Sequence, residues 1–200
     1  MIPELNEGKP ANLLDLDEEE KLRLKSFCLL SSKPMLYACN LKEEEIIDPS
    51  ANEKFVAFEQ WANQQQDATC CAISAKMEEE LSELEEAEAK EYLESMGVSD
   101  SGVTSLIKAC YDLLGLASYL TAGEKEARAW TFTKGMTAPQ CAGVIHTDFE
   151  KAFIKAEVVS FDELIEAGSM QAARESGKLR LEGKEYLFAD GDVALFKCNA

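Results

Sequence analysis

The chain has 200 residues, of which 46% are hydrophobic, and a formal net charge of −18, which suits one large domain or two small ones with real cores. No apolar run approaches the roughly 18 residues that a membrane-spanning helix needs, and the N-terminus does not resemble a signal peptide. The excess of acids argues against specific DNA recognition and against strong non-specific binding to nucleic acid.

The first elements in chain order predict a βαβ unit. Residues 1–11 contain two prolines and a glycine and are expected to be loose, and a helix within 12–30 is expected to be capped by Asp15 or Asp17. The apolar runs 34–39 and 68–73 are typical of parallel strands buried on both faces. A helix over 52–66 connects them, with a right-handed crossover expected.

Two more helices are predicted before residue 115. Residues 77–96 have helical spacing of apolar side chains and end at Gly97. Their many glutamates form either a solvated face or an interaction surface. A second amphipathic helix covers 99–114 and stops at Gly115.

A small α+β domain of ubiquitin-like size is predicted after residue 115. Its expected helices begin near Thr137 and near Ser160 or Asp162, the second ending near Gly168, and the stretch 168–177 is expected to be a loop. The last three strands are expected to be joined by hairpin turns. The strands are predicted over residues 125–133, 155–159, 179–181, 185–188 and 193–196.

The seven cysteines are odd in number and include no Cys-x-x-Cys pair. They are interpreted as free, largely buried thiols of a reducing cytosol. With a single histidine in the chain, no zinc or other metal site is predicted. A redox sensor at Cys70 and Cys71 is a weaker alternative, because adjacent strand residues point to opposite faces.

The most informative motif is Asn40-Leu41-Lys42-Glu43, directly after the first predicted strand. P-loop NTPases recognise the purine base at such a sheet edge, and GTP-specific members carry Asn-Lys-x-Asp there. Asn40 can bind a purine edge or brace the loops, Leu41 offers an apolar face, and Glu43 is one methylene longer than Asp, which weakens a guanine preference. Taken alone, the motif also fits a solvated loop.

The C-terminal 85 residues resemble the TGS domain of the YchF-type Obg-like ATPases. The segments that carry the resemblance are 118–123, 128–131, 135–140, 145–156, 177–186 and 190–193. Upstream, residues 40–43 match the Asn-x-x-Glu motif of the ATP-preferring members, and 72–76 resemble the final G-domain motif, where Ser74 and Ala75 are expected to offer backbone N–H groups to the base.

The resemblance implies an α/β remnant of a P-loop G domain followed by an α+β β-grasp (ubiquitin-like) TGS domain. Residues 1–24 correspond to the end of a helical insertion, 25–115 to the distal part of the G domain, and 116–200 to the TGS domain. The implied ligands are ATP and Mg²⁺, the implied partner is the ribosome, and the implied location is cytoplasmic. The implied role is translation or stress regulation.

No Gly-x-x-x-x-Gly-Lys-Ser/Thr motif occurs in the 200 residues. The phosphate loop, its lysine and Mg²⁺ supply most NTP affinity and the hydrolytic chemistry. No catalytic residue and no Mg²⁺ ligand is therefore assigned, and the chain by itself is expected to bind nucleotide poorly and to lack ATPase activity. The alternative function is a non-enzymatic module that binds ribosomes, RNA or protein.

Other candidate residues have structural and functional interpretations. His146 is expected to pack or to cap a helix. Trp130 and Phe149 are expected in a core, with stacking on RNA bases as the alternative.

The charge is unevenly distributed along the chain. Residues 1–115 contain 10 Lys and Arg and 25 Asp and Glu, whereas residues 116–200 are nearly balanced, with 10 Lys and Arg and 13 Asp and Glu. An RNA-binding face and an ordinary mixed surface are therefore both open for the basic residues Lys151, Lys155, Arg174, Lys178, Arg180 and Lys184.

Overall fold

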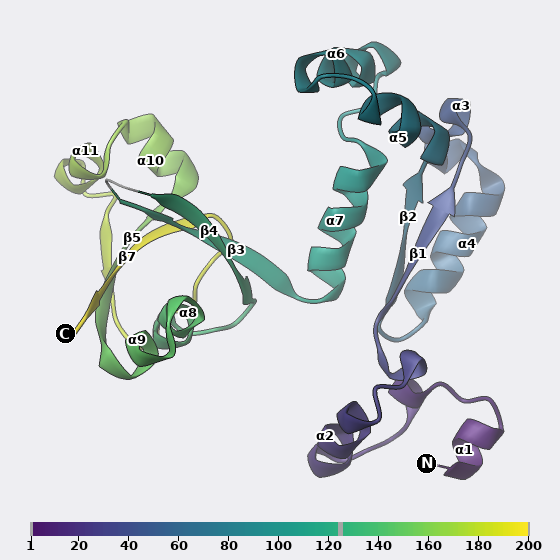
Figure 1. Ribbon diagram of the computed structural model, residues 1–200, viewed down its shortest axis with the longest axis horizontal. Helices are drawn as coiled ribbons and strands as arrows, with labels where there is room; N and C mark the ends of the chain where they lie inside the picture. Colours follow the sequence, from purple (N-terminus) through teal and green to yellow (C-terminus); the bar gives the residue numbers. More distant parts are fainter. Residues whose placement is uncertain (1, 124–125, 200) are drawn as a thin grey trace. The chain divides into compact units, whose positions relative to one another are not determined.

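A computed structural model describes residues 2–123 and 126–199. The chain divides into two compact units, Met1–Leu114 and Gly115–Ala200, which are drawn in Figure 1. Lys125, where a strand was predicted to begin, lies outside the described residues. Within those residues, no helix combines the length and the apolar character needed to cross a membrane.

The first unit opens with short helical pieces rather than a loose tail. Its helical elements are α1 (Ile2–Asn6), η1 (Ala11–Leu13), α2 (Glu18–Ser26), η2 (Leu30–Ser32), α3 (Glu43–Ile46), η3 (Pro49–Ala51), α4 (Glu53–Gln64), α5 (Ala75–Ser82), α6 (Glu86–Met96) and α7 (Gly102–Leu113). The prediction that residues 1–11 are loose was wrong, because Leu5 packs against a small cluster around Ala11 and Leu24. The predicted cap is confirmed: Asp17 accepts a hydrogen bond from the Glu20 N–H. The helix itself is shorter than expected and ends at Ser26.

The βαβ prediction is confirmed. Strands β1 (Met35–Asn40) and β2 (Ala68–Ile73) are parallel, with Met35 opposite Ala68 and Asn40 opposite Ile73, and α4 connects them. Burial of the strands on both faces is not observed, since β1 has only exposed and half-buried residues, with Met35 43% exposed, and all of β2 is half-buried. The physical reason is that the helices α4 and α7, which cover the faces of this two-stranded sheet, pack mainly against β2 rather than β1.

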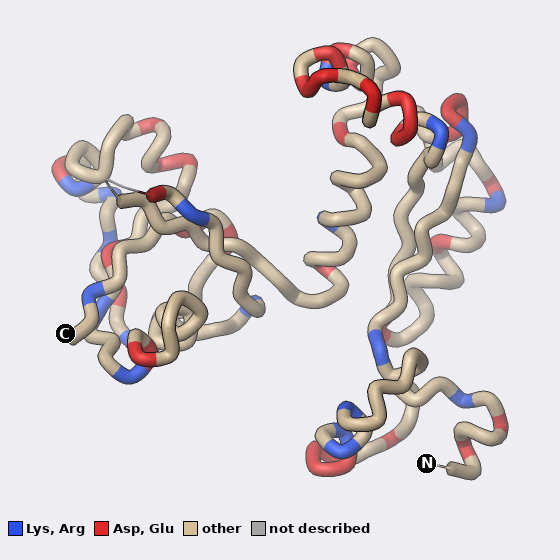
Figure 2. The backbone as a smooth tube through the Cα atoms, viewed as in Figure 1, with Lys and Arg blue, Asp and Glu red and all other residues tan. Residues whose placement is uncertain are grey.

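The acidic stretch 77–96 forms two helices instead of one. α5 ends at Ser82, and α6 begins after Glu85, whose N–H donates to the Glu88 carboxylate at 3.3 Å. Glutamates spaced three and four residues apart repel one another on a helix, which favours a break within this run. Figure 2 shows acidic residues gathered over α5 and α6.

The second unit is a five-stranded mixed sheet. Its strands are β3 (Leu116–Ala122), β4 (Ala127–Thr133), β5 (Phe153–Ser160), β6 (Arg180–Glu182) and β7 (Asp192–Cys198), and its helices are α8 (Ala138–Ile145), α9 (Thr147–Ala152), α10 (Phe161–Ala167) and α11 (Met170–Glu175). The strand order is β4-β3-β7-β5-β6, with β3 and β7 parallel and the other pairs antiparallel.

Several local predictions for this unit were wrong. β3 was missed although it is a central strand, and α11 occupies the stretch 168–177 that was expected to be a loop. Residues 185–188 form no strand: Leu187 makes one isolated bridge to Thr137, and the Ala138 N–H donates to the Tyr186 carbonyl. The expected hairpins are also absent from the described residues, because β6 and β7 each pair with β5 rather than with one another.

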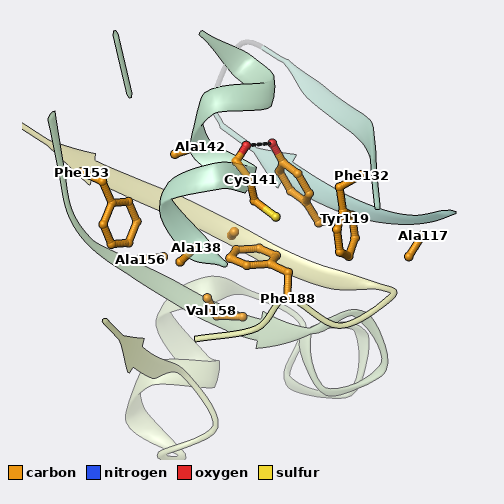
Figure 3. Packing of buried hydrophobic residues seen from close by; sticks show 11 residues of the cluster. Ala117, Tyr119, Phe132, Ala138, Cys141, Ala142, Phe153, Ala156, Val158 and Phe188 are labelled. Carbon is orange, nitrogen blue, oxygen red and sulfur yellow. Dashed lines mark hydrogen bonds between the residues drawn. The ribbon is translucent and has the colours of Figure 1, made fainter. Parts of the chain in front are cut away.

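The main core lies between the sheet and α8. Tyr119 of β3 is fully buried, and its ring contacts Phe188 edge-on at 5.2 Å between centroids. Its hydroxyl donates to the Cys141 carbonyl of α8 at 2.8 Å (Figure 3). This bond satisfies two polar groups that would otherwise be costly to bury.

The cysteines are free, as predicted, but they differ in burial. Cys141 is buried, Cys28 is exposed, and the other five are half-buried. Cys141 thus fits the expected buried thiol, whereas Cys28 does not.

Candidate functional site

The carboxyl ends of β1 and β2 bring two distant segments together. Asn40 lies opposite Ile73, and the Leu41 N–H donates to the Ile73 carbonyl at 2.8 Å. Parallel strands end at the same edge of a sheet, which is where α/β proteins bind ligands. Residues 40–43 and 74–76 therefore meet at this edge.

Asn40 braces the two loops. Its Oδ1 accepts a hydrogen bond from the Ala75 N–H at 3.0 Å, so the backbone group that was expected to face a base donates to Asn40 instead. Because the amide oxygen is the acceptor, the NH₂ group is oriented as a donor. Asn40 itself is exposed, which leaves that donor accessible to an incoming molecule.

Ser74 has a different environment from its neighbours. Its side chain is 2% exposed, and its hydroxyl has no hydrogen-bond partner among the described residues. It lines a cavity of about 240 Å³ together with Glu78, Asp100 and Gly102. A water-sized molecule in such a polar space satisfies buried hydroxyls of this kind.

Glu43 pairs with a residue that the sequence prediction did not assign. Glu43 begins α3, and its Oε2 lies 2.9 Å from Nζ of Lys76, the second residue of α5. This bond raises the pKa of Lys76, so the ammonium stays charged at neutral pH. The only signal in the sequence was a lysine directly after the Ser74-Ala75 dipeptide.

The edge therefore presents three kinds of group to a ligand. Asn40 offers an amide donor, Leu41 a half-buried apolar side chain, and Glu43 with Lys76 a carboxylate–ammonium pair. This set suits a flat heterocycle with donors and acceptors on its rim. Among the residues that the structure describes, no cluster of three or more His, Cys, Asp or Glu is arranged to hold a metal ion.

Comparison with known proteins gives a consistent result. A family model named YchF-GTPase_C, described as a protein of unknown function (DUF933), matches residues 116–199. A Bacillus subtilis (strain 168) protein named "Ribosome-binding ATPase YchF" is 50% identical over 191 residues, which cover 96% of this chain and 52% of that protein. The protein of the same name from Escherichia coli O157:H7 is 38% identical over 198 residues, or 99% of this chain and 53% of the relative.

These matches support the assignment of the chain as part of a YchF-type Obg-like protein. The solved Schizosaccharomyces pombe YchF GTPase agrees, with a TM-score of 0.76, 35% identity, and coverage of 97% of this chain and 51% of that one. The chain spans about half the length of the curated relatives that it matches. The YchF relatives' names favour a nucleotide-dependent family over the alternative of a purely non-enzymatic module.

The predicted aromatic and histidine residues of this chain have mostly structural roles. His146 caps α9, and its Nδ1 accepts from the Asp148 N–H at 3.2 Å, as predicted. Trp130 is half-buried against the core of the second unit, and its Nε1 donates to Thr121 at 2.9 Å. Phe149 is 39% exposed, so its predicted place in a core was wrong.

The basic residues of the second unit are interleaved with acids. Arg174 pairs with Glu157 at 2.8 Å, Arg180 pairs with Glu182 at 3.1 Å, and Lys178 pairs with Glu166. Exposed pairs of this kind leave little net positive field. The arrangement favours an ordinary mixed surface over a continuous RNA-binding face.

Proposed function

We propose that this chain functions as the C-terminal part of a ribosome-associated, ATP-preferring Obg-like NTPase. The observation that carries the proposal is 50% identity over 96% of the chain to a relative named as a ribosome-binding ATPase. The ribosome is then the macromolecular partner and ATP the nucleotide, and the location is the cytoplasm, where ribosomes work. The role in translation or stress regulation follows from the same resemblance.

The first unit is proposed to be the base-recognition end of a nucleotide domain. On this view, residues 1–24 are the end of a helical insertion and 25–115 the distal part of a G domain. The parallel β1–β2 pair supports this assignment, since its carboxyl edge brings the Asn40 and Ala75 segments together.

The second unit, residues 116–200, is proposed to be a β-grasp TGS domain. Counted within this unit, the strands lie in the order second, first, fifth, third, fourth, with the parallel first and fifth strands in the middle. This order is that of the ubiquitin-like β-grasp. Helix α8, packed against the same core, corresponds to the helix that the sheet grasps.

Recognition of the base is assigned to five residues. The Asn40 NH₂ group donates to a ring nitrogen, Leu41 packs against the ring, and Glu43 accepts from an exocyclic amino group. Ser74 and Ala75 complete the edge, with Ala75 acting through its bond to Asn40. These five residues are assigned to the purine base and not to the phosphates of the nucleotide.

The triphosphate and Mg²⁺ require groups outside these 200 residues. Mg²⁺ supplies charge neutralisation of the transferring phosphoryl group when it is bound, and the chain carries no Walker A motif. We expect no ATP turnover by the 200-residue chain. Turnover that disappears in a Glu43→Ala variant would contradict this assignment.

Co-sedimentation with ribosomes tests the proposed association. The 200-residue chain is expected to pellet with purified ribosomes and to stay in the supernatant without them. Failure to pellet at micromolar concentrations of both would argue against the proposal. Pelleting that persists without nucleotide and is lost on deletion of residues 116–200 would fit the interaction-module alternative better, because that module needs no nucleotide.

A further inference from the structure

Lys76 is held between two carboxylates at the proposed base edge. Its Nζ lies 2.9 Å from Glu43 Oε2 and 3.7 Å from Glu80 Oε1. The Tyr92 hydroxyl donates to the other Glu80 oxygen at 2.9 Å, which fixes that carboxylate in turn. The ammonium therefore has a defined position although the lysine side chain is 68% exposed.

The ion pair changes what Glu43 can accept. A free carboxylate has two oxygens and can receive two neighbouring donors at once. Guanine presents such a pair, N1–H and N2–H₂, on its Watson–Crick edge. Because the Lys76 ammonium already donates to Oε2 of Glu43 and places a cation beside that oxygen, only the other oxygen faces a base without a competing donor.

The adenine edge has a different requirement. Adenine offers one donor, N6–H₂, next to one acceptor, N1. The remaining Glu43 oxygen can take the donor, and the ammonium has further N–H groups for the acceptor. The carboxylate–ammonium pair thus satisfies adenine, whereas guanine would set two donors against one free acceptor and a cation.

We propose that Lys76 is a specificity-determining residue that favours adenine over guanine by occupying one oxygen of Glu43. This inference rests on the proposed function of the β1–β2 edge as a purine site. The role of Lys76 is to select the base rather than to stabilise the fold, since exposed ion pairs contribute little to folding.

The test uses the ¹⁵N-labelled 200-residue chain titrated with AMP and, separately, with GMP. The backbone amides of Leu41 and Ala75 report on the edge. The unmodified chain is expected to bind AMP more tightly than GMP. In Lys76→Met, the ratio of the two dissociation constants is expected to move about tenfold towards GMP, the size of one lost hydrogen-bond preference.

Two further variants act as controls. Lys90→Met removes another exposed lysine, which pairs with Glu94 at 3.9 Å on α6, and should leave the AMP-to-GMP ratio unchanged. Lys76→Arg keeps a cation beside Glu43 and should keep the preference for AMP. A variant that matches the unmodified chain in the amide spectrum of β1 and β2 is folded at this edge.

The outcomes separate the two claims. If neither nucleotide shifts the reporter amides of the unmodified chain, the proposed base site is wrong, and the inference falls with it. If AMP binds but Lys76→Met leaves the ratio unchanged, the base site stands and the role of Lys76 is overturned. A shift towards GMP in Lys90→Met as large as that in Lys76→Met would also overturn it, because the effect would then be one of net charge.

Discussion

At the scale of single residues, the polar groups of the proposed base edge are bonded to one another before any ligand arrives. The Ala75 N–H donates to Asn40, and Lys76 donates to Glu43. Such bonds fix side chains that would otherwise lose conformational freedom on binding. The core of the second unit also pairs its polar groups, since the buried Tyr119 hydroxyl donates to the Cys141 carbonyl.

Tyr119→Phe tests that buried hydrogen bond. Removing the hydroxyl leaves the Cys141 carbonyl without this donor, which should lower the free energy of unfolding by about 1–3 kcal/mol. Urea denaturation in a Trp61→Phe background, in which Trp130 is the remaining tryptophan of the sequence, would measure it by fluorescence. Tyr37→Phe, which alters a half-buried ring of the first unit, should leave the stability of the second unit unchanged. An equal loss in both variants would contradict the assignment.

Thiol labelling tests the burial of the cysteines. Burial raises the pKa of Cys141 to about 12 and that of Cys70 to about 11, so at pH 8 both thiols remain protonated and unreactive. Folding favours the neutral form of both thiols. Their burial therefore costs no stability at a pH below the pKa of the thiol in the unfolded chain, and the free energy of unfolding falls only as the pH rises above that pKa.

In the native chain at pH 8, exposed Cys28 should react with a maleimide well before Cys70 and Cys141. Peptide mapping by mass spectrometry would rank the sites, with labelling in urea as the control for intrinsic reactivity. Joint rapid labelling of Cys70 and Cys71 would instead favour the redox-sensor alternative.

At the scale of elements, helix starts are governed by short polar contacts. Asp17, Ser101, Ser160 and Ser169 each accept a backbone N–H at the beginning of their helix. α7 has an additional partner from another helix: the Glu78 carboxylate of α5 accepts from the Gly102 N–H at 2.6 Å. A negative charge at this end is favoured by the helix dipole.

Glu78→Gln tests this contact between α5 and α7. The amide oxygen can still accept one hydrogen bond, but the charge is gone, so the first unit should lose about 1 kcal/mol of stability. Amide hydrogen exchange would show lower protection at the start of α7. Glu79→Gln, an exposed neighbour on the same helix, is the matched control. Equal effects in the two variants would indicate a general response to charge.

At the scale of the whole molecule, the two units differ in the size of their cores. Among the described residues, six buried hydrophobic side chains lie in Met1–Leu114 and fourteen in Gly115–Ala200, although the first unit is longer. Burial of apolar surface is the main favourable contribution to folding. Within the part of the chain that the structure describes, β1 also has one edge without a neighbouring strand.

Hydrogen exchange of the whole chain should therefore find the first unit less protected. The slowest amides are expected in β3, β5 and β7, and those of β1 and β2 should exchange at least tenfold faster. Mass spectrometry at peptide resolution is sufficient for this comparison. Equal protection in the two units would contradict the difference in stability.

The local features of the fold were largely predictable because they depend on neighbours in sequence. The cap at Asp17 and the stop at Gly97 follow from short-range chemistry, and the βαβ pattern around Asn40 was visible as two apolar runs on either side of a helical one. Phe149 was misjudged for a related reason, since an aromatic residue does not by itself reveal which side of its helix is covered.

The sequence by itself determined the family resemblance, the helix boundaries set by capping residues, and the pair of motifs at residues 40–43 and 74–76. Only the tertiary structure decided that Leu116–Ala122 is a central strand, because its mixed small and large residues lack a clear period and its burial comes from β4 and β7. It also decided the partners of Asn40 and Glu43. Those contacts join residues more than thirty positions apart, and such contacts depend on how strands pair rather than on local preference.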